Sequence, residues 1–367
     1  MKKSLLLAAL AACGMAGSAL AADVEVYGLI DYGFSLSRTS GDNAGAQDGE
    51  WSFAAKSGMR NSSRVGFRGT EDLGNGYKVH FVLENQFLAD TGALQDTSSF
   101  FARESSVAVS GPFGKLTFGK VGKLRSPVGT TALASTITNP FGSQMSNFVG
   151  GTKSVTSGDY LTINNAVTYM SPSMAGLRLY AQYSFANNTE EGGADNDDRY
   201  MALGARYSNG PLLVTGIVDT INLKNPDDLK HDDPTTVTIL GSYDFGVVKP
   251  YAFVHYFENG TINTMGGFIR ANSEDTYDGY GLGFSLQWPM GGGRAKVGVG
   301  YMDAEYSDSP VKNDVTRYTV QAGYDYVLTK QTHLYTDIGY AQQDQDTNTG
   351  KTSLEGFEVL AGMVHYF

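Results

Sequence analysis

The chain has 367 residues, a formal net charge of −11 at pH 7 and a single cysteine, Cys13. A chain this acidic is poorly suited to binding nucleic acid, and one thiol excludes both a disulfide framework and a thiolate metal site. The 46 glycines, 22 tyrosines and 19 phenylalanines favour strands and tight turns over long helices.

The segment 1–21 has the three parts of a secretory signal peptide: a charged start, an apolar run at 5–12 and a small-residue site ending at Ala21. The residues before Cys13 also resemble a lipoprotein signal, but their apolar run is short and a better cleavage site follows. Cleavage after Ala21 removes 21 of the 367 residues and leaves 346. Because two lysines are lost, 25 basic side chains remain against 38 acidic ones, a net charge of −13.

The rest of the chain alternates tight turns with longer polar loops. Seven turns carry residues suited to φ > 0 or to a fixed φ, at 72–76, 110–114, 171–176, 208–211, 244–246, 289–293 and 328–331. Eight loops rich in Asp, Asn, Ser, Thr and Gly lie at 39–59, 89–98, 121–160, 187–198, 222–234, 259–276, 307–314 and 344–355. These fifteen connections predict sixteen antiparallel strands in an up-and-down sheet.

The predicted strands have one apolar face and one small or polar face. In the segment 279–288, Tyr280, Leu282, Phe284 and Trp288 alternate with glycine, serine and glutamine. A soluble barrel of sixteen strands would enclose more volume than these side chains can fill, so we expect the apolar face outside and water inside. Residues 22–367 contain no run of eighteen apolar residues and hence no candidate transmembrane helix. The prediction is an all-β, 16-stranded antiparallel transmembrane β-barrel.

The last strand alternates up to a terminal aromatic residue, Phe367. A soluble sandwich could also end on such a strand, but a bilayer requires that no strand edge stays unpaired, because a lone peptide group in hydrocarbon costs several kcal/mol. We therefore expect the first strand, residues 24–36, to pair with the last. Three residues do not fit this pattern: Leu360 and Val364 are apolar on the lumenal face, and Glu104 falls on the outer face. Register bulges and subunit contacts both remain open as explanations.

Four segments carry a resemblance to a known family: 24–33 (VEVYGLIDYG), 63–76 (SRVGFRGTEDLGNG), 113–120 (FGKLTFGK) and 362–367 (GMVHYF). Together they resemble Gram-negative general outer-membrane porins, most closely those of betaproteobacteria. The resemblance implies a homotrimeric barrel in the outer membrane, with short periplasmic turns, long extracellular loops and a third loop, 121–160, folded inward as the constriction. It also implies that Phe367 is read by the outer-membrane assembly machinery, a role compatible with an aromatic at the periplasmic girdle.

Strand parity and the resemblance together predict the residues of the pore. Outward Val65 and Phe67 direct Arg64 and Arg68 to the lumen, and the next strand directs Lys78 and Glu84 inward. By resemblance, the constriction residues are Arg64 and Glu84, with further wall bases Arg103 and Lys120. The third loop of this chain adds the base Arg125 as a further candidate. For each arginine the alternative is a lumenal ion pair that only stiffens the barrel.

The third loop departs from the family pattern. Between Lys120 and Gly158 there is no Asp or Glu, whereas Lys123, Arg125 and Lys153 are present, and only the turn Pro140-Phe-Gly142 matches. We therefore expect an eyelet that prefers small anions or is weakly selective. Distant acidic residues should matter less, because the Debye length is roughly 10 Å at about 0.1 M salt.

The expected partners are small hydrophilic solutes and ions, outer-membrane lipid and lipopolysaccharide, with no cofactor. The acidic stretches 195–198 and 227–233 could bridge divalent cations to lipopolysaccharide, but solvated loops with no metal site explain them better. There is no nucleophile elbow, no paired metal-binding histidines and no P-loop, so we predict a channel and not an enzyme. Alternatives are a substrate-specific channel, an outer-membrane phospholipase and a structural or adhesive barrel.

Overall fold

The computed structural model describes residues 23–42, 48–134, 139–142, 148–149, 154–158, 161–187, 198–223, 232–262, 275–307 and 312–367. The predicted signal peptide 1–21, Lys153 and most of the acidic stretches 195–198 and 227–233 lie outside these ranges. Across the described ranges, no helix is both long and apolar enough to cross a membrane.

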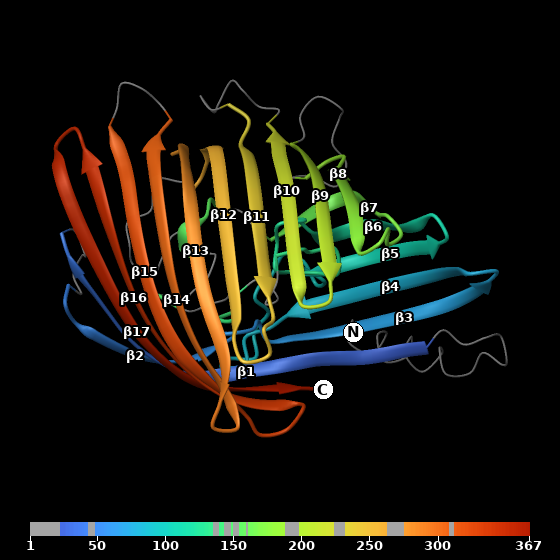
Figure 1. Ribbon diagram of the computed structural model, residues 1–367, viewed down its shortest axis with the longest axis horizontal. Helices are drawn as coiled ribbons and strands as arrows, with labels where there is room; N and C mark the ends of the chain where they lie inside the picture. The colour runs from blue at the N-terminus through green and yellow to red at the C-terminus, as the bar shows by residue number, and fades with distance from the viewer. Residues whose placement is uncertain are drawn as a thin grey trace, which may run out of the picture.

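The described residues form one antiparallel sheet (Figure 1). Its strands are β1 (Asp23–Gly41), β2 (Trp51–Ser57), β3 (Arg64–Gly74), β4 (Tyr77–Gln86), β5 (Glu104–Gly111), β6 (Gly114–Gly122), β7 (Thr162–Met170), β8 (Leu177–Ser184), β9 (Arg199–Asn209), β10 (Leu212–Asn222), β11 (Thr235–Tyr243), β12 (Lys249–Gly260), β13 (Tyr277–Met290), β14 (Gly293–Tyr306), β15 (Asn313–Val327), β16 (Thr332–Thr347) and β17 (Gly350–Tyr366). In Figure 1 the short turns β9–β10, β11–β12 and β13–β14 lie together at the lower end of the strands.

The sheet closes on itself, as predicted. β1 pairs with β17 from Leu29↔Tyr366 to Gly41↔Leu354. Beyond that ladder, the Gly28 amide donates to the Phe367 carbonyl at 3.0 Å and the Phe367 amide donates to the Gly28 carbonyl at 3.1 Å. Closure leaves no open edge, the condition a bilayer imposes on strands.

Strands β2 and β3 are two halves of one barrel strand, which reduces seventeen segments to sixteen barrel strands. β2 pairs with β1 as far as Ser57↔Tyr32, and β3 resumes that pairing at Arg64↔Leu29. The six residues 58–63 therefore stand opposite only two residues of β1. The surplus bulges away from the ladder, and Met59 within it is 1% exposed.

Two predicted loops contain long stretches of strand. The segment 39–59 contains the end of β1 and all of β2, and the segment 344–355 forms a hairpin in which Thr347 pairs with Gly350. Polar composition suggested loops, but above the bilayer a strand no longer needs an apolar outer face. There the strands are stabilised by hydrogen bonds between polar side chains on neighbouring strands, and one example is the Ser353 hydroxyl, which donates to Asp344 at 2.6 Å.

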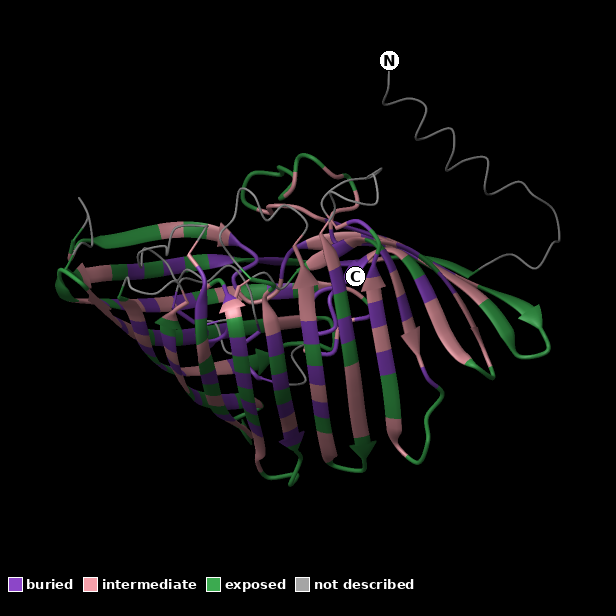
Figure 2. Ribbon diagram, turned by 90° about the horizontal axis from the view of Figure 1, so that it is seen from above, coloured by how far each residue is buried: buried purple, intermediate pink, exposed green. Residues whose placement is uncertain are grey.

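The expected alternation of faces is present along the strands (Figure 2). On β13 the outward Tyr280, Leu282 and Phe284 are 40%, 39% and 46% exposed in the isolated chain, whereas Tyr277 on the inward face is buried. Apolar side chains thus cover the outside of the barrel, where lipid replaces water as their solvent.

Candidate functional site

The described parts of the third loop, between β6 and β7, lie against the inner wall. They contribute Leu124 and Leu133 to one apolar cluster with β7–β10, Val155 to a second with β11–β15, and Phe141 and Val149 to a third. Each cluster combines loop residues with inward-facing wall residues. The loop therefore fills part of the lumen and narrows the space left for water.

The third cluster explains two residues that broke the sequence pattern. Leu360 and Val364 face inward and are each 1% exposed, because Phe141 and Val149 of the third loop pack in the same cluster. Neither a bulge nor a subunit contact is needed. An apolar residue on the lumenal face marks a place where the loop covers the wall.

Glycines of the wall and the loop make this close approach possible. A Cβ at Gly281 on β13 would lie 1.6 Å from the Val155 carbonyl oxygen, so only glycine fits beneath the loop. Gly142 has φ of +75°, and a Cβ there would lie 2.4 Å from the Arg60 carbonyl oxygen. The turn at Pro140–Gly142 is therefore fitted to the bulge at 58–63.

Glu104 on β5 is also an anchor of the loop, and its expected outward orientation is wrong. Its carboxylate accepts hydrogen bonds from the Thr130 amide at 2.7 Å, the Thr130 hydroxyl at 2.6 Å and the Ser106 hydroxyl at 2.7 Å. Glu104 and Ser106 share the inward face, with Val107 exposed on the other. The carboxylate is fully engaged in holding the loop.

The bases of the third loop are buried against the wall. Arg125 Nε lies 2.8 Å from Asp219 Oδ2 of β10, and its Nη2 donates to the Gly158 carbonyl at 3.1 Å. Lys123 is fully buried, with Nζ 5.2 Å from the centre of the Tyr200 ring. Both residues therefore hold the loop against the wall, and their charges lie away from open water. For Arg125 this structural ion pair is the alternative to a role in the pore.

Three of the predicted pore residues come together on the wall. Arg103 Nε lies 2.6 Å from Glu84 Oε1, and Arg64 Nε lies 3.5 Å from Glu84 Oε2. The Tyr27 hydroxyl donates to Glu84 Oε2 at 2.9 Å. Two guanidiniums thus share the carboxylate of Glu84, while Glu104, its register partner, is buried and bonded to the third loop. The Arg64 side chain is 27% exposed and presents its positive charge to the lumen.

The other predicted wall residues lie elsewhere. Arg68 pairs with Glu25 at 2.8 Å, and Lys78 lies 3.7 Å from Asp72, both beside the first short turn and exposed. Lys120 donates to Asn164 at 2.8 Å. Its register partner is Ser105, which shares the outer face with exposed Val107, whereas the next residue, Val121, is buried inside. We therefore do not include these three bases in the eyelet.

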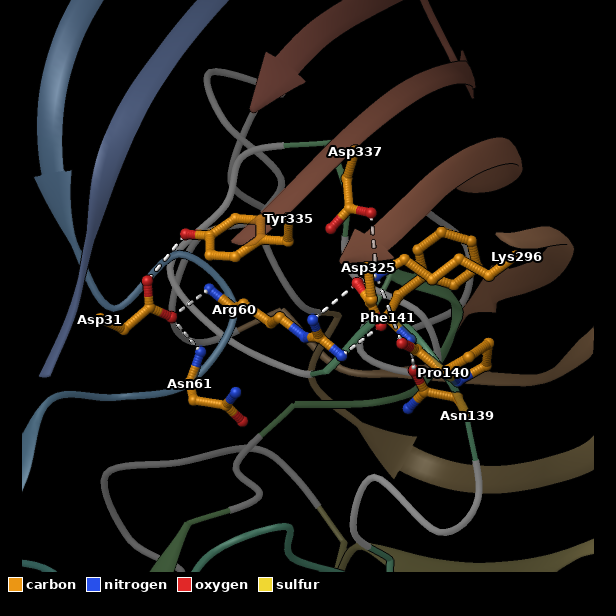
Figure 3. Close-up of polar contacts among 10 residues, drawn as sticks. All are labelled: Asp31, Arg60, Asn61, Asn139, Pro140, Phe141, Lys296, Asp325, Tyr335 and Asp337. Carbon is orange, nitrogen blue, oxygen red and sulfur yellow. Dashed lines mark hydrogen bonds and ion pairs between the residues drawn. The ribbon is translucent and has the colours of Figure 1, made fainter. Parts of the chain in front are cut away.

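Arg60, in the bulge 58–63, heads a buried network that sequence reasoning did not single out (Figure 3). Its two terminal nitrogens each lie 2.6 Å from the Asp325 carboxylate. Lys296 Nζ lies 3.0 Å from Asp325 and 2.8 Å from Asp337, so two bases face two acids. The Phe141 ring of the third loop lies 5.0 Å from Lys296 Nζ, which ties the loop to the network.

A neighbouring carboxylate, Asp31 of β1, fixes the backbone of the bulge. Asp31 Oδ2 accepts the amides of Arg60 at 2.9 Å and Asn61 at 2.6 Å, and Oδ1 accepts the Tyr335 hydroxyl at 2.7 Å. Strand parity places Asp325 and Asp337 inward, so these acids were predictable from sequence. Arg60 was not, because the break in the strand that turns it inward has no clear sequence signal.

The described residues contain no group of three or more His, Asp or Glu side chains arranged to hold a metal ion. The carboxylates described above are instead bonded to arginine, lysine, hydroxyl or amide groups. What the arrangement offers is a narrowed aqueous passage with fixed charges on its wall.

Comparison with known proteins agrees with this architecture. Residues 7–347 match the family model described as Gram-negative porin. The chain is 30% identical to an outer membrane porin protein of Bordetella pertussis over 403 residues, covering 100% of both chains. It is also 30% identical to "Outer membrane porin protein 32" of Delftia acidovorans over 369 residues, covering 99% of this chain and 95% of the relative.

Solved structures share the fold. "Anion-selective porin from Comamonas acidovorans" superposes with a TM-score of 0.64 at 22% identity, covering 94% of this chain and 100% of that one. The trimer form of OmpT from Vibrio cholerae superposes with a TM-score of 0.62 at 17% identity, covering 94% and 99%. Family match, closed barrel and full-length relatives together establish that the chain belongs to the Gram-negative porins, channel proteins of the outer membrane.

Proposed function

We propose that the protein is a non-catalytic diffusion channel for small hydrophilic solutes, and that its eyelet prefers small anions. The observation that carries the preference is the partly exposed guanidinium of Arg64, which lies with Arg103 on the carboxylate of Glu84. The bases of the Arg60 network, in contrast, are buried against carboxylates. Arg64 therefore supplies the exposed charge that a passing ion meets.

From Lys120 to Gly158 the third loop supplies no opposing acidic charge. This segment lacks Asp and Glu, and its described bases, Lys123 and Arg125, are buried. A field across the pore between an acidic loop and a basic wall is therefore not expected here. Selection depends on the wall charge and on the width that the loop leaves.

The preference predicts the sign of the zero-current potential across a planar bilayer in a KCl gradient. Chloride crosses faster than potassium through an anion-preferring pore, so the dilute side should become negative. The overall acidity of the protein should have little influence at about 0.1 M salt, because the Debye length there is roughly 10 Å. A dilute side that becomes clearly positive would show a cation preference and contradict the proposal.

We also propose that the channel assembles as a homotrimer and contacts lipopolysaccharide through its outer face. The named trimer form of OmpT supports the first point by fold similarity. The exposed apolar side chains on the outside of the barrel support the second. Trimeric assembly should appear as three equal conductance steps when a single particle inserts into a bilayer.

We propose a further role for Phe367 as the assembly signal. Its backbone completes the barrel by pairing with Gly28, while its side chain is 46% exposed and available to a partner. Phe367→Ala should therefore lower the amount of folded protein in the outer membrane without preventing refolding of the purified chain in detergent. Phe357→Ala, on the same face of β17, is the matched control. Equal losses in both variants would reduce Phe367 to an ordinary outer-face aromatic.

A further inference from the structure

A second set of lumenal bases lies at the short-turn, periplasmic end of the barrel, away from the eyelet. Lys115, Arg178, Lys249 and Arg294 are the first or second residues of β6, β8, β12 and β14, directly after the turns that precede these strands. Arg206 lies three residues before the end of β9. These five positions therefore line the same mouth of the channel.

Arg178 and Arg206 both face the lumen. Arg178 shares the face of Tyr180 and Gln182, and the Gln182 side chain accepts the Leu124 amide of the third loop at 3.1 Å. Arg206 Nη2 donates directly to the Leu133 carbonyl of the same loop. The other face of these strands carries exposed Leu179 and Leu203 toward lipid.

The two arginines stand directly opposite each other, since the register of β8 and β9 pairs Arg178 with Arg206. Cβ atoms at such positions are about 4.5–5.5 Å apart, and like charges there repel. Among the described residues, neither guanidinium has a carboxylate within ion-pairing distance. Arg68, at the same mouth, shows the contrast: its guanidinium is held by Glu25 at 2.8 Å.

Arg206 is held in place and Arg178 is not buried. Arg206 Nε donates to the Thr215 hydroxyl at 3.2 Å, which together with its bond to Leu133 fixes the guanidinium. Arg178 is exposed to the aqueous mouth. A fixed arginine beside an exposed one can close on an oxyanion, because planar guanidiniums bind carboxylate or phosphate through paired hydrogen bonds.

We propose that Arg178 and Arg206 form a binding site in the periplasmic mouth for oxyanions that carry two negative charges, phosphate or dicarboxylate. The proposal rests on the channel function above and adds a site to it. A divalent anion removes the repulsion between both guanidiniums, whereas a monovalent anion leaves one positive charge unmatched. Lys115, Lys249 and Arg294 add positive charge at the same mouth, where Asp23 and Glu25 lie beside Lys115.

The consequence is a channel that responds differently from its two sides. A divalent anion added on the periplasmic side reaches the pair before it meets the eyelet, and its residence there obstructs the passage of chloride. The same anion added on the extracellular side must first cross the constriction. Block of the current should therefore be stronger from the periplasmic side.

The test uses the full-length channel in a planar bilayer at about 0.1 M KCl, where screening is moderate. Inorganic phosphate in its divalent form, succinate or acetate is added to one side at a time. The variant Thr349→Cys, at the extracellular connection of β16 and β17, reports the direction of insertion. A membrane-impermeant thiol reagent reacts with it only from the side to which the extracellular loops point. Phosphate, succinate or both should block the chloride current from the periplasmic side, and acetate should not. Comparison of phosphate with succinate shows whether the site favours phosphate or dicarboxylate.

Arg178→Gln should raise the concentration of divalent anion that blocks half of the current roughly tenfold. Arg178→Lys should restore part of the affinity, since lysine keeps the positive charge but lacks the paired N–H donors of the guanidinium. Lys330→Gln removes one charge from the exposed turn between β15 and β16 and is the matched control. Equal block from both sides, block by acetate, or unchanged block in Arg178→Gln would overturn the site. The zero-current potential of the same channels tests the eyelet separately, so failure of one proposal is distinguishable from failure of the other.

Discussion

Arg60→Met is expected to lower the free energy of unfolding by about 3 kcal/mol or more, the usual cost of removing one partner from a buried ion pair. Asp325 is fully buried, and both of its oxygens lie 2.6 Å from the Arg60 nitrogens. Without Arg60, Lys296 alone would have to neutralise Asp325 and Asp337. The buried site would then carry an excess negative charge.

The loss should be measured by denaturant unfolding of the purified barrel, followed through the fluorescence of Trp51 and Trp288. Arg60→Met combined with Asp325→Asn should be more stable than the sum of the single losses predicts, because the pair Lys296–Asp337 then stands alone and matched. Lys312→Met, which removes an exposed pair with Asp346, should change stability by less than about 1 kcal/mol. A similar small effect in Arg60→Met would show that the network does not hold the bulge.

The same substitution should alter the open channel. Phe141 and Pro140 of the third loop lie on Lys296, and Gly142 lies against the Arg60 backbone. Loosening this contact frees the loop segment that narrows the lumen. Current recordings of Arg60→Met should therefore show larger fluctuations in the open state than recordings of the unaltered protein.

Arg64→Glu is expected to turn the eyelet from anion-preferring to cation-preferring. The charge that residue 64 presents to the lumen beside Arg103 and Glu84 would change from one positive to one negative. Two unit charges at about 8 Å from the path, screened at about 0.1 M salt, shift the ratio of anion to cation permeability roughly fivefold. Arg64→Gln should produce about half of that change in free energy.

The zero-current potential in a KCl gradient measures this shift. Lys312→Glu makes the same change in net charge at the extracellular rim, where Lys312 pairs with Asp346, and should leave the potential nearly unchanged. A comparable shift in both variants would mean that the net charge of the protein, and not the eyelet, sets selectivity.

The fold was largely predictable because a transmembrane barrel imposes a strict period of two. Tyr280, Leu282 and Phe284 face outward as their spacing required, and the last strand pairs with the first. The prediction failed at the strand ends that extend beyond the bilayer, where lipid no longer requires apolar residues on the outer face. Apart from Leu354, residues 344–355 are polar or glycine, so composition suggested a loop, whereas hydrogen bonds between polar side chains support a hairpin.

The site was predictable in part. Parity placed Arg64 and Glu84 inward, and the structure brings Arg103 to the same carboxylate. Lys120 was placed on the lumenal wall by resemblance, whereas its parity with exposed Phe118 puts it on the outer face of β6. Parity could not show that Arg125 would be buried against Asp219, since no sequence pattern tells where a long loop will pack.

The sequence by itself determined that this chain is a sixteen-stranded barrel with a lipid-facing exterior, because local alternation and turn chemistry are written along each strand. Tertiary structure alone decided which lumenal charges remain unmatched. That outcome depends on partners far apart in the chain, such as Arg60 with Asp325 and Arg178 with Arg206. A charge acts on a passing ion only if no neighbour has neutralised it, and neighbours across a closed sheet are known only once the sheet has closed.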